Sequence, residues 1–189
     1  MFGKPEPLVT PSIRRLRSPQ CWIGRPYGPP IAFVMHTAAG GQSGTVAELL
    51  NSAAQISTHY AAGLDGSLDC YIDPSNRAWS NGILEPGNQW ATIAWDCSVD
   101  PGLSPNHITI TCETEDHDDP LQPVTDAQFE AVLYAAREAK VRYPHSLRYL
   151  ARHSDISPQS RADCPGDRWI ASGRFHSLAQ ALGLRTLVE

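Results

Sequence analysis

Hydrophobic and polar residues follow a pattern that is typical of short buried strands separated by amphipathic helices. Residues 31–35 form an unbroken apolar run bounded by Pro30 and the Gly40-Gly41 pair, which predicts a central strand ending at His36. Residues 57–72 contain two β-prone runs around Leu64-Asp-Gly-Ser67. Asp-Gly predicts a hairpin there, because glycine accepts a positive φ.

A third strand is predicted over residues 107–113, where polar and apolar side chains alternate strictly. Ile108, Ile110 and Cys112 should lie on one face, and the opposite face should carry His107, Thr109, Thr111 and Glu113. Another short strand over 147–150 should lead to His153. Residues 80–105 have no clear period and predict a long loop that faces a substrate.

Two capping-box patterns predict where helices begin. Thr45 with Glu48 predicts a helix over about 45–55, and Thr125 with Gln128 predicts a second helix that runs to about Tyr143. The apolar stripe of the second helix consists of Phe129, Val132, Leu133 and Ala136. A final helix should stop at Gly183. Strands mixed with crossover helices indicate an α/β domain around one sheet.

The 189 residues predict one domain over 31–189, preceded by an extended, proline-rich N-terminal arm over 1–30. The net charge is −5, and no basic run extends beyond Arg14-Arg-Leu-Arg17, so nucleic acid is not an expected partner. The apolar run after Pro30 is too short to span a bilayer, and no signal peptide is apparent, so we expect synthesis in the cytoplasm and no membrane partner.

The sequence contains 5 cysteines, an odd number at wide spacing, which is unlike a disulfide framework. We therefore expect that Cys97 and Cys112 do not form a required disulfide. One of the other cysteines is a candidate metal ligand. His36 and His153 each end a predicted strand, and Cys164 lies in Asp-Cys-Pro-Gly166. Two imidazoles and a thiolate suit Zn²⁺ and leave a fourth position for water, although spacing alone also fits ordinary histidines and a buried thiol.

A set of short motifs in one order extends this hypothesis over roughly residues 30–170. The motifs are Met35-His-Thr-Ala-Ala-Gly40, Ser57-Thr-His-Tyr60 with Leu64-Asp-Gly66, Arg77-Ala-Trp-Ser-Asn-Gly82, Asn106 with Ile110 and Glu113, His153-Ser-Asp-Ile-Ser-Pro158, and Asp163-Cys-Pro-Gly166. Together they resemble the type 2 zinc-dependent N-acetylmuramoyl-L-alanine amidases, which include phage endolysins and peptidoglycan recognition proteins. The resemblance implies a single domain with a central mixed β-sheet flanked by helices.

The resemblance also implies roles for individual residues. The zinc ligands fall on His36, His153 and a third residue, for which Cys164 is favoured over Asp163. Glu113 falls on the catalytic glutamate. Substrate-binding positions fall on Trp79, Asn81, Thr58, His59 and Arg161. Trp79 also fits a core tryptophan, and His59 could equally pack in the sheet.

Two positions depart from the family pattern. Thr58 stands where some members carry a catalytic tyrosine. Ala162 stands where others place a lysine two residues before the third ligand. Arg161 is a candidate substitute for that lysine, because its permanent charge could reach a developing oxyanion.

The expected function is hydrolysis of the amide bond between N-acetylmuramic acid and L-alanine in bacterial peptidoglycan, by an endolysin-type monomer that reaches the wall after holin-type release. Two alternatives remain. One is a module of the same fold that binds peptidoglycan without cutting it. The other is a thiol hydrolase that uses Cys164 with His153.

Overall fold

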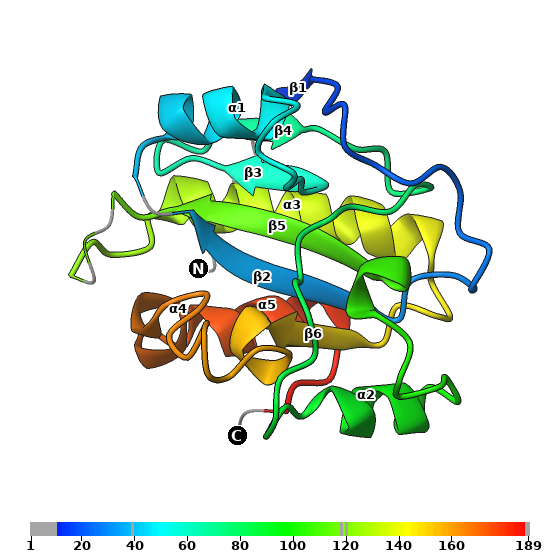
Figure 1. Cartoon of the computed structure of the whole chain (residues 1–189). Helices are drawn as coiled ribbons and strands as arrows, with labels where there is room; N and C mark the ends of the chain where they lie inside the picture. The colour runs from blue at the N-terminus through cyan, green and yellow to red at the C-terminus, as the bar shows by residue number, and fades with distance from the viewer. Residues whose placement is uncertain (1–10, 39, 118, 120, 188–189) are drawn as a thin grey trace.

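A mixed sheet of 6 strands forms the centre of the protein (Figure 1). The computed structural model describes residues 11–38, 40–117, 119 and 121–187, so the first ten residues of the predicted arm lie outside the described residues. The strands are β1 (Ile13–Arg15), β2 (Ala32–Ala38), β3 (Tyr60–Ala62), β4 (Leu68–Cys70), β5 (Thr109–Glu115) and β6 (Tyr149–Arg152). Their order is β1-β4-β3-β5-β2-β6, and β3 and β4 pair antiparallel whereas the other neighbours pair parallel. The predicted α/β domain with a central mixed sheet is confirmed.

Helices cover both faces of this sheet. The helical elements are α1 (Gln42–Leu50), α2 (Trp90–Asp96), α3 (Asp126–Arg142), α4 (Asp167–Ala171) and α5 (Arg174–Leu182), with 3-10 turns η1 (Pro105–His107) and η2 (His153–Asp155). On one face, Phe33 and Met35 of β2 pack in a core that includes α3 and α5. On the other face, Ala32 and Val34 pack with Trp90 of α2. Figure 1 shows α3 running behind β3 and β5.

Several predicted elements are confirmed at their boundaries. Gly66 has φ of 86° in the turn that joins β3 to β4. The Thr125 hydroxyl accepts a hydrogen bond from the Gln128 amide at 3.0 Å and caps α3. Gly183 ends α5 in the left-handed conformation.

Other predictions require correction. The first helix spans 42–50 rather than 45–55, and Gly41 is its N-cap. Thr45 is therefore inside the helix, where its hydroxyl donates to the Gly41 carbonyl at 3.4 Å instead of capping. Ile108 does not share a face with Ile110, because η1 precedes β5 and turns Ile108 into the core beside α2.

Two elements were not predicted. The loop expected over 80–105 contains α2, a helix of 7 residues that buries Trp90, Ile93 and Ala94. Within the segment assigned to an arm, β1 pairs with β4, and Trp22 forms an isolated bridge with Arg77. All 5 cysteines are free. Among the described residues, no helix has the length and apolar character needed to cross a membrane.

A fully buried histidine joins the start of β3 to β5. His59 Nδ1 accepts the Thr111 amide N–H at 3.1 Å, and its Nε2 lies 3.3 Å from the Asn76 carbonyl. Burial, together with the neighbouring charge of Arg25, lowers the pKa of His59 to about 3. The folded protein therefore holds this imidazole in the neutral form.

We predict that His59 makes the fold less stable as the pH falls. An unfolded histidine titrates near 6.5, so the unfolded state takes up this proton at a higher pH than the folded state does. The stabilising contribution of neutral His59 to the free energy of unfolding is therefore complete above pH 6.5 and is lost as the pH falls towards 3. The slope for one proton is about 1.4 kcal/mol per pH unit. Urea unfolding from pH 4.5 to 6.5, with a chelator in every sample, should give a shallower slope for His59→Gln than for the unsubstituted protein. Equal slopes would contradict this assignment.

Candidate active site

Three parallel strands bring candidate chemical groups to one face of the sheet. His36 in β2 is paired in register with Glu113 in β5. Side chains alternate along a strand, so His36 lies on the same face as Val34, opposite Met35. His153 directly follows β6 and has the same parity as Ala151, which packs in the core of that face. All three side chains thus meet where parallel strands end, a common place for sites in α/β folds.

The three predicted ligands form one cluster. The candidate ligand atoms of His36, His153 and Cys164 all lie within 4.8 Å of one another, and all three residues are buried. The two imidazole rings have centroids 4.2 Å apart. Cys164 arrives from the loop between η2 and α4, and the Ser154 amide donates to its carbonyl at 3.2 Å. Its sulfur accepts the Thr37 amide N–H at 3.3 Å.

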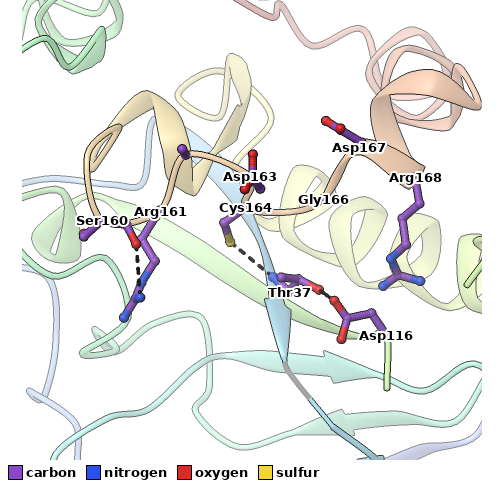
Figure 2. Close-up of a pocket in the computed structure, with 10 residues that line it drawn as sticks. Thr37, Asp116, Ser160, Arg161, Asp163, Cys164, Gly166, Asp167 and Arg168 are labelled. Atoms are coloured by element: carbon purple, nitrogen blue, oxygen red, sulfur yellow. Dashed lines mark hydrogen bonds between the residues drawn. The ribbon is translucent and has the colours of Figure 1, made fainter. Parts of the chain in front are cut away.

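Asp163 and Cys164 point in different directions. Figure 2 shows the sulfur directed towards Thr37 and the Asp163 carboxylate directed away from it. Asp163 is exposed, whereas Cys164 is buried. This arrangement favours the sulfur as the third donor, in line with the sequence prediction.

Several hollows border this cluster, and two of the larger ones reach Cys164. A cleft of about 400 Å³ is lined by His36, Glu113, His153 and Cys164 together with Trp79 and Arg161. A second cavity of about 460 Å³ lies on the far side of Cys164 and includes Thr37, Asp116 and Arg168 (Figure 2). The first cleft is the candidate site, because it alone of these two is lined by both histidines and Glu113.

Burial controls the protonation of these groups. Burial, together with the nearby carboxylate of Glu48, raises the pKa of Glu113 to about 8. It lowers the pKa of His153 to about 4 and that of His36 well below its usual value, so both imidazoles are neutral. Burial also raises the pKa of Cys164 to about 12, which leaves the thiol protonated unless a cation is bound beside it.

The five predicted substrate-binding residues divide into two groups. Trp79 is half-buried and Arg161 is exposed, and both line the cleft. Thr58, His59 and Asn81 are fully buried and do not line it. Thr58 bonds to the Thr111 hydroxyl at 2.9 Å, so its side chain faces the sheet. The structure thus places these three residues behind the cleft wall rather than on its surface.

Sequence reasoning missed two contributors to the site. One is the main-chain N–H of Thr37, for which no side-chain signal exists. The other is Glu48, which was interpreted as a capping residue but lines the cleft from the last turn of α1.

Comparison with known proteins identifies the family. Residues 26–167 match the sequence profile of the family described as N-acetylmuramoyl-L-alanine amidase. This chain belongs to the N-acetylmuramoyl-L-alanine amidase family. It is 30% identical over 115 residues to the 1,6-anhydro-N-acetylmuramyl-L-alanine amidase AmpD of Enterobacter cloacae. That match covers 60% of this chain and 52% of AmpD, so the chain spans about half the length of this curated relative.

Solved amidases share the fold. A selenomethionine derivative of AmpD has a TM-score of 0.64 at 21% identity, and the match covers 94% of this chain and 99% of that chain. AmiD from E. coli, solved with anhydro-N-acetylmuramic acid-L-Ala-D-gamma-Glu-L-Lys, has a TM-score of 0.60 at 24% identity, with 84% and 59% covered. The endolysin amidase LysCS of Clostridium intestinale also has a TM-score of 0.60, at 14% identity, with 95% and 100% covered.

The geometry predicts which of two adjacent residues would ligate a metal ion at this cluster. Cys164→Ser should lose most bound zinc, because the buried sulfur is the third donor of the cluster. Asp163→Asn should keep it, because that carboxylate is exposed. Zinc content of the purified variants by mass spectrometry checks both. Retention in the serine variant together with loss in the asparagine variant would move the ligand to Asp163.

Proposed function

We propose that this chain is a zinc-dependent amidase that hydrolyses the bond between N-acetylmuramic acid and the L-alanine of the peptidoglycan stem, with the role of an endolysin-type lytic enzyme. The observation that carries the proposal is the cluster of His36, His153 and Cys164 beside Glu113 in one cleft of a family member. The names of AmpD and AmiD, which describe cleavage at N-acetylmuramyl-L-alanine, support the choice of bond.

The donor set fits zinc. Two neutral imidazoles and a sulfur are ligands that this borderline-soft ion prefers, and three protein ligands are typical of catalytic rather than structural zinc sites. The cluster is compact, within 4.8 Å, and opens to a cleft. Zinc held there would supply Lewis-acid polarisation of the scissile carbonyl and would acidify a water molecule.

Glu113 is suited to move the proton. Its Oε1 lies 3.8 Å from His36 Nδ1, so the carboxylate borders the cluster directly. Its pKa, raised to about 8 in the metal-free protein, lies near neutrality, and a cation held by the cluster would lower this pKa and favour the carboxylate form. The carboxylate takes a proton from the attacking water and returns it to the amide nitrogen, which leaves poorly unless it is protonated.

Arg161 and Trp79 shape the rest of the cleft. Arg161 stands at its rim, where a guanidinium can donate to the oxygen that becomes negative during attack. No lysine is available at the family position, so Arg161 is the cation that we assign to this role. The half-buried ring of Trp79 forms one wall and offers an apolar surface to a sugar or peptide.

The two alternative functions receive less support. Binding modules of this fold have usually lost a zinc ligand, whereas all three candidate donors are gathered here. A thiol hydrolase needs a thiolate, but burial raises the pKa of Cys164 to about 12. His153, with a pKa lowered to about 4, is also too weak a base to remove that proton.

The discriminating experiment is digestion of purified peptidoglycan followed by mass spectrometry. An amidase releases stem peptides with a free N-terminal L-alanine. A chelator should abolish this release and added zinc should restore it. Activity that survives the chelator but is lost with iodoacetamide would indicate the thiol enzyme, and binding without any release would indicate the binding module. Loss of turbidity of permeabilised bacteria tests the lytic role separately.

We predict that Glu113→Gln keeps the fold and bound zinc but loses turnover. General acid–base catalysis contributes about 10²–10⁴-fold, so kcat should fall by that factor. The matched control is Glu130→Gln in α3, which lies on the opposite face of the sheet. Peptide release is measured by mass spectrometry for both. A glutamine variant at position 113 with unchanged kcat would remove Glu113 from the mechanism.

A further inference from the structure

Both histidines of the cluster turn one ring nitrogen towards the same residue. His36 Nε2 lies 3.2 Å from the side-chain oxygen of Asn81, and His153 Nε2 lies 3.3 Å from the Asn81 main-chain oxygen. Asn81 is fully buried and does not line the cleft. A substrate therefore does not reach it, and its polar atoms serve the protein interior.

The orientation of the Asn81 amide follows from its neighbours. The Thr109 hydroxyl donates to the Pro105 carbonyl at 2.9 Å, so its oxygen is left to accept. Asn81 Nδ2 donates to that oxygen at 2.9 Å. The side-chain oxygen of Asn81 must then face His36.

Two acceptor oxygens determine the tautomers of both rings. A carbonyl oxygen can only accept, so each Nε2 must carry the proton of its neutral imidazole. The lone pair is then on Nδ1 in each ring. In His36, Nδ1 is the nitrogen that lies 3.8 Å from Glu113, on the cleft side. Both rings thus present a metal-binding lone pair away from Asn81.

The main chain of Asn81 is itself held in place. The side-chain oxygen of Asn106 accepts the amide N–H groups of Asn81, at 2.8 Å, and of Ser80, at 3.1 Å. Farther along the same segment, the Gln89 amide donates to the Asp155 carbonyl of η2 at 2.8 Å. The segment that carries the two carbonyl groups of Asn81 is therefore tied to η1 and η2.

We propose that Asn81 is a positioning residue for the metal centre, whose side-chain and main-chain oxygens orient the His36 and His153 imidazoles and hold both in the tautomer that leaves Nδ1 free for the ion. This inference rests on the proposed function for its metal, but it concerns ring orientation, which exists in the metal-free protein. Substitution of a group that orients a ligating histidine typically weakens metal affinity by about 10–100-fold.

The test uses Asn81→Ala and Asn81→Asp in the full chain. Alanine removes the side-chain acceptor, whereas aspartate keeps an acceptor oxygen of similar size. Zinc affinity is measured by competition with a chromophoric chelator, and the tautomers are measured in metal-free protein by nitrogen-15 NMR of the histidine rings. The matched control is Asn88→Ala, which removes side-chain hydrogen bonds to Glu85 and Trp90 in the same segment without touching either histidine.

We expect Asn81→Ala to bind zinc about 10–100-fold more weakly and to shift the His36 tautomer, while His153 keeps its Nε2 proton because the main-chain oxygen remains. Asn81→Asp and Asn88→Ala should bind zinc within about threefold of the unsubstituted protein. Unchanged affinity and an unchanged His36 tautomer in the alanine variant would overturn the proposal. If alanine at this position prevents folding, a loss of zinc affinity of about tenfold or more in Asn81→Asp overturns the proposal. Absence of amidase activity in the unsubstituted chain would refute the proposed function alone, because neither readout depends on turnover.

Discussion

The register of β2 between β5 and β6 is the constraint on which the site depends. His36 lies beside Glu113 because Met35 is paired with Cys112 and Phe33 with Ile110 across two parallel strands. A shift of one residue would turn every side chain of β2 to the opposite face. Such a slip would move Phe33 and Met35, which are fully buried beside α3, out of that core and onto the face that carries His36 and Glu113. The apolar core on one side of the sheet therefore fixes the chemistry on the other.

Irregular segments complete what the strands begin. The strands place two imidazoles and a carboxylate, but the sulfur comes from the loop after η2 and the oxygens behind the imidazoles come from the segment after β4. These two segments are tied to each other, since the Glu85 amide donates to the Ile156 carbonyl at 3.3 Å. This hydrogen bond helps to hold both segments in position where neither belongs to a helix or strand.

The sequence predicted the regular parts of the fold where side-chain period and turn chemistry agree. Each of three features requires a conformation that only a few residue types adopt readily: the β3–β4 turn, the start of α3 and the end of α5 at Gly183. The period fails for α2, because 7 residues bury a stripe of only Trp90, Ile93 and Ala94 within a stretch rich in glycine and proline. The period also fails for β1, because 3 residues are too few to show an alternation and the strand is defined by its pairing with β4.

For the candidate site, the sequence located the cluster but not its surroundings. His36 lies within β2 and His153 directly follows β6, so alternation along each strand fixes the direction of the side chain. Asn81 and Thr58 stand in irregular segments without a period, so nothing local told whether each faces the cleft or the sheet. Whether Asp163 or Cys164 faces the cluster follows from the exposed carboxylate of the first and the buried sulfur of the second. That difference depends on how the whole loop folds.

The two outermost strands bear on how copies of the molecule meet. At one margin β1 has only 3 residues, and the side chains of Arg14 and Arg15 are 59% and 58% exposed. At the other margin, β6 is partly covered by the chain near Arg185, which bridges to Tyr149 and accepts the Leu150 amide N–H. Long unpaired strand edges are the usual template for aggregation, and short or charged edges suppress it. The short, charged edge and the partly covered edge of the described sheet therefore both oppose edge-to-edge polymerisation.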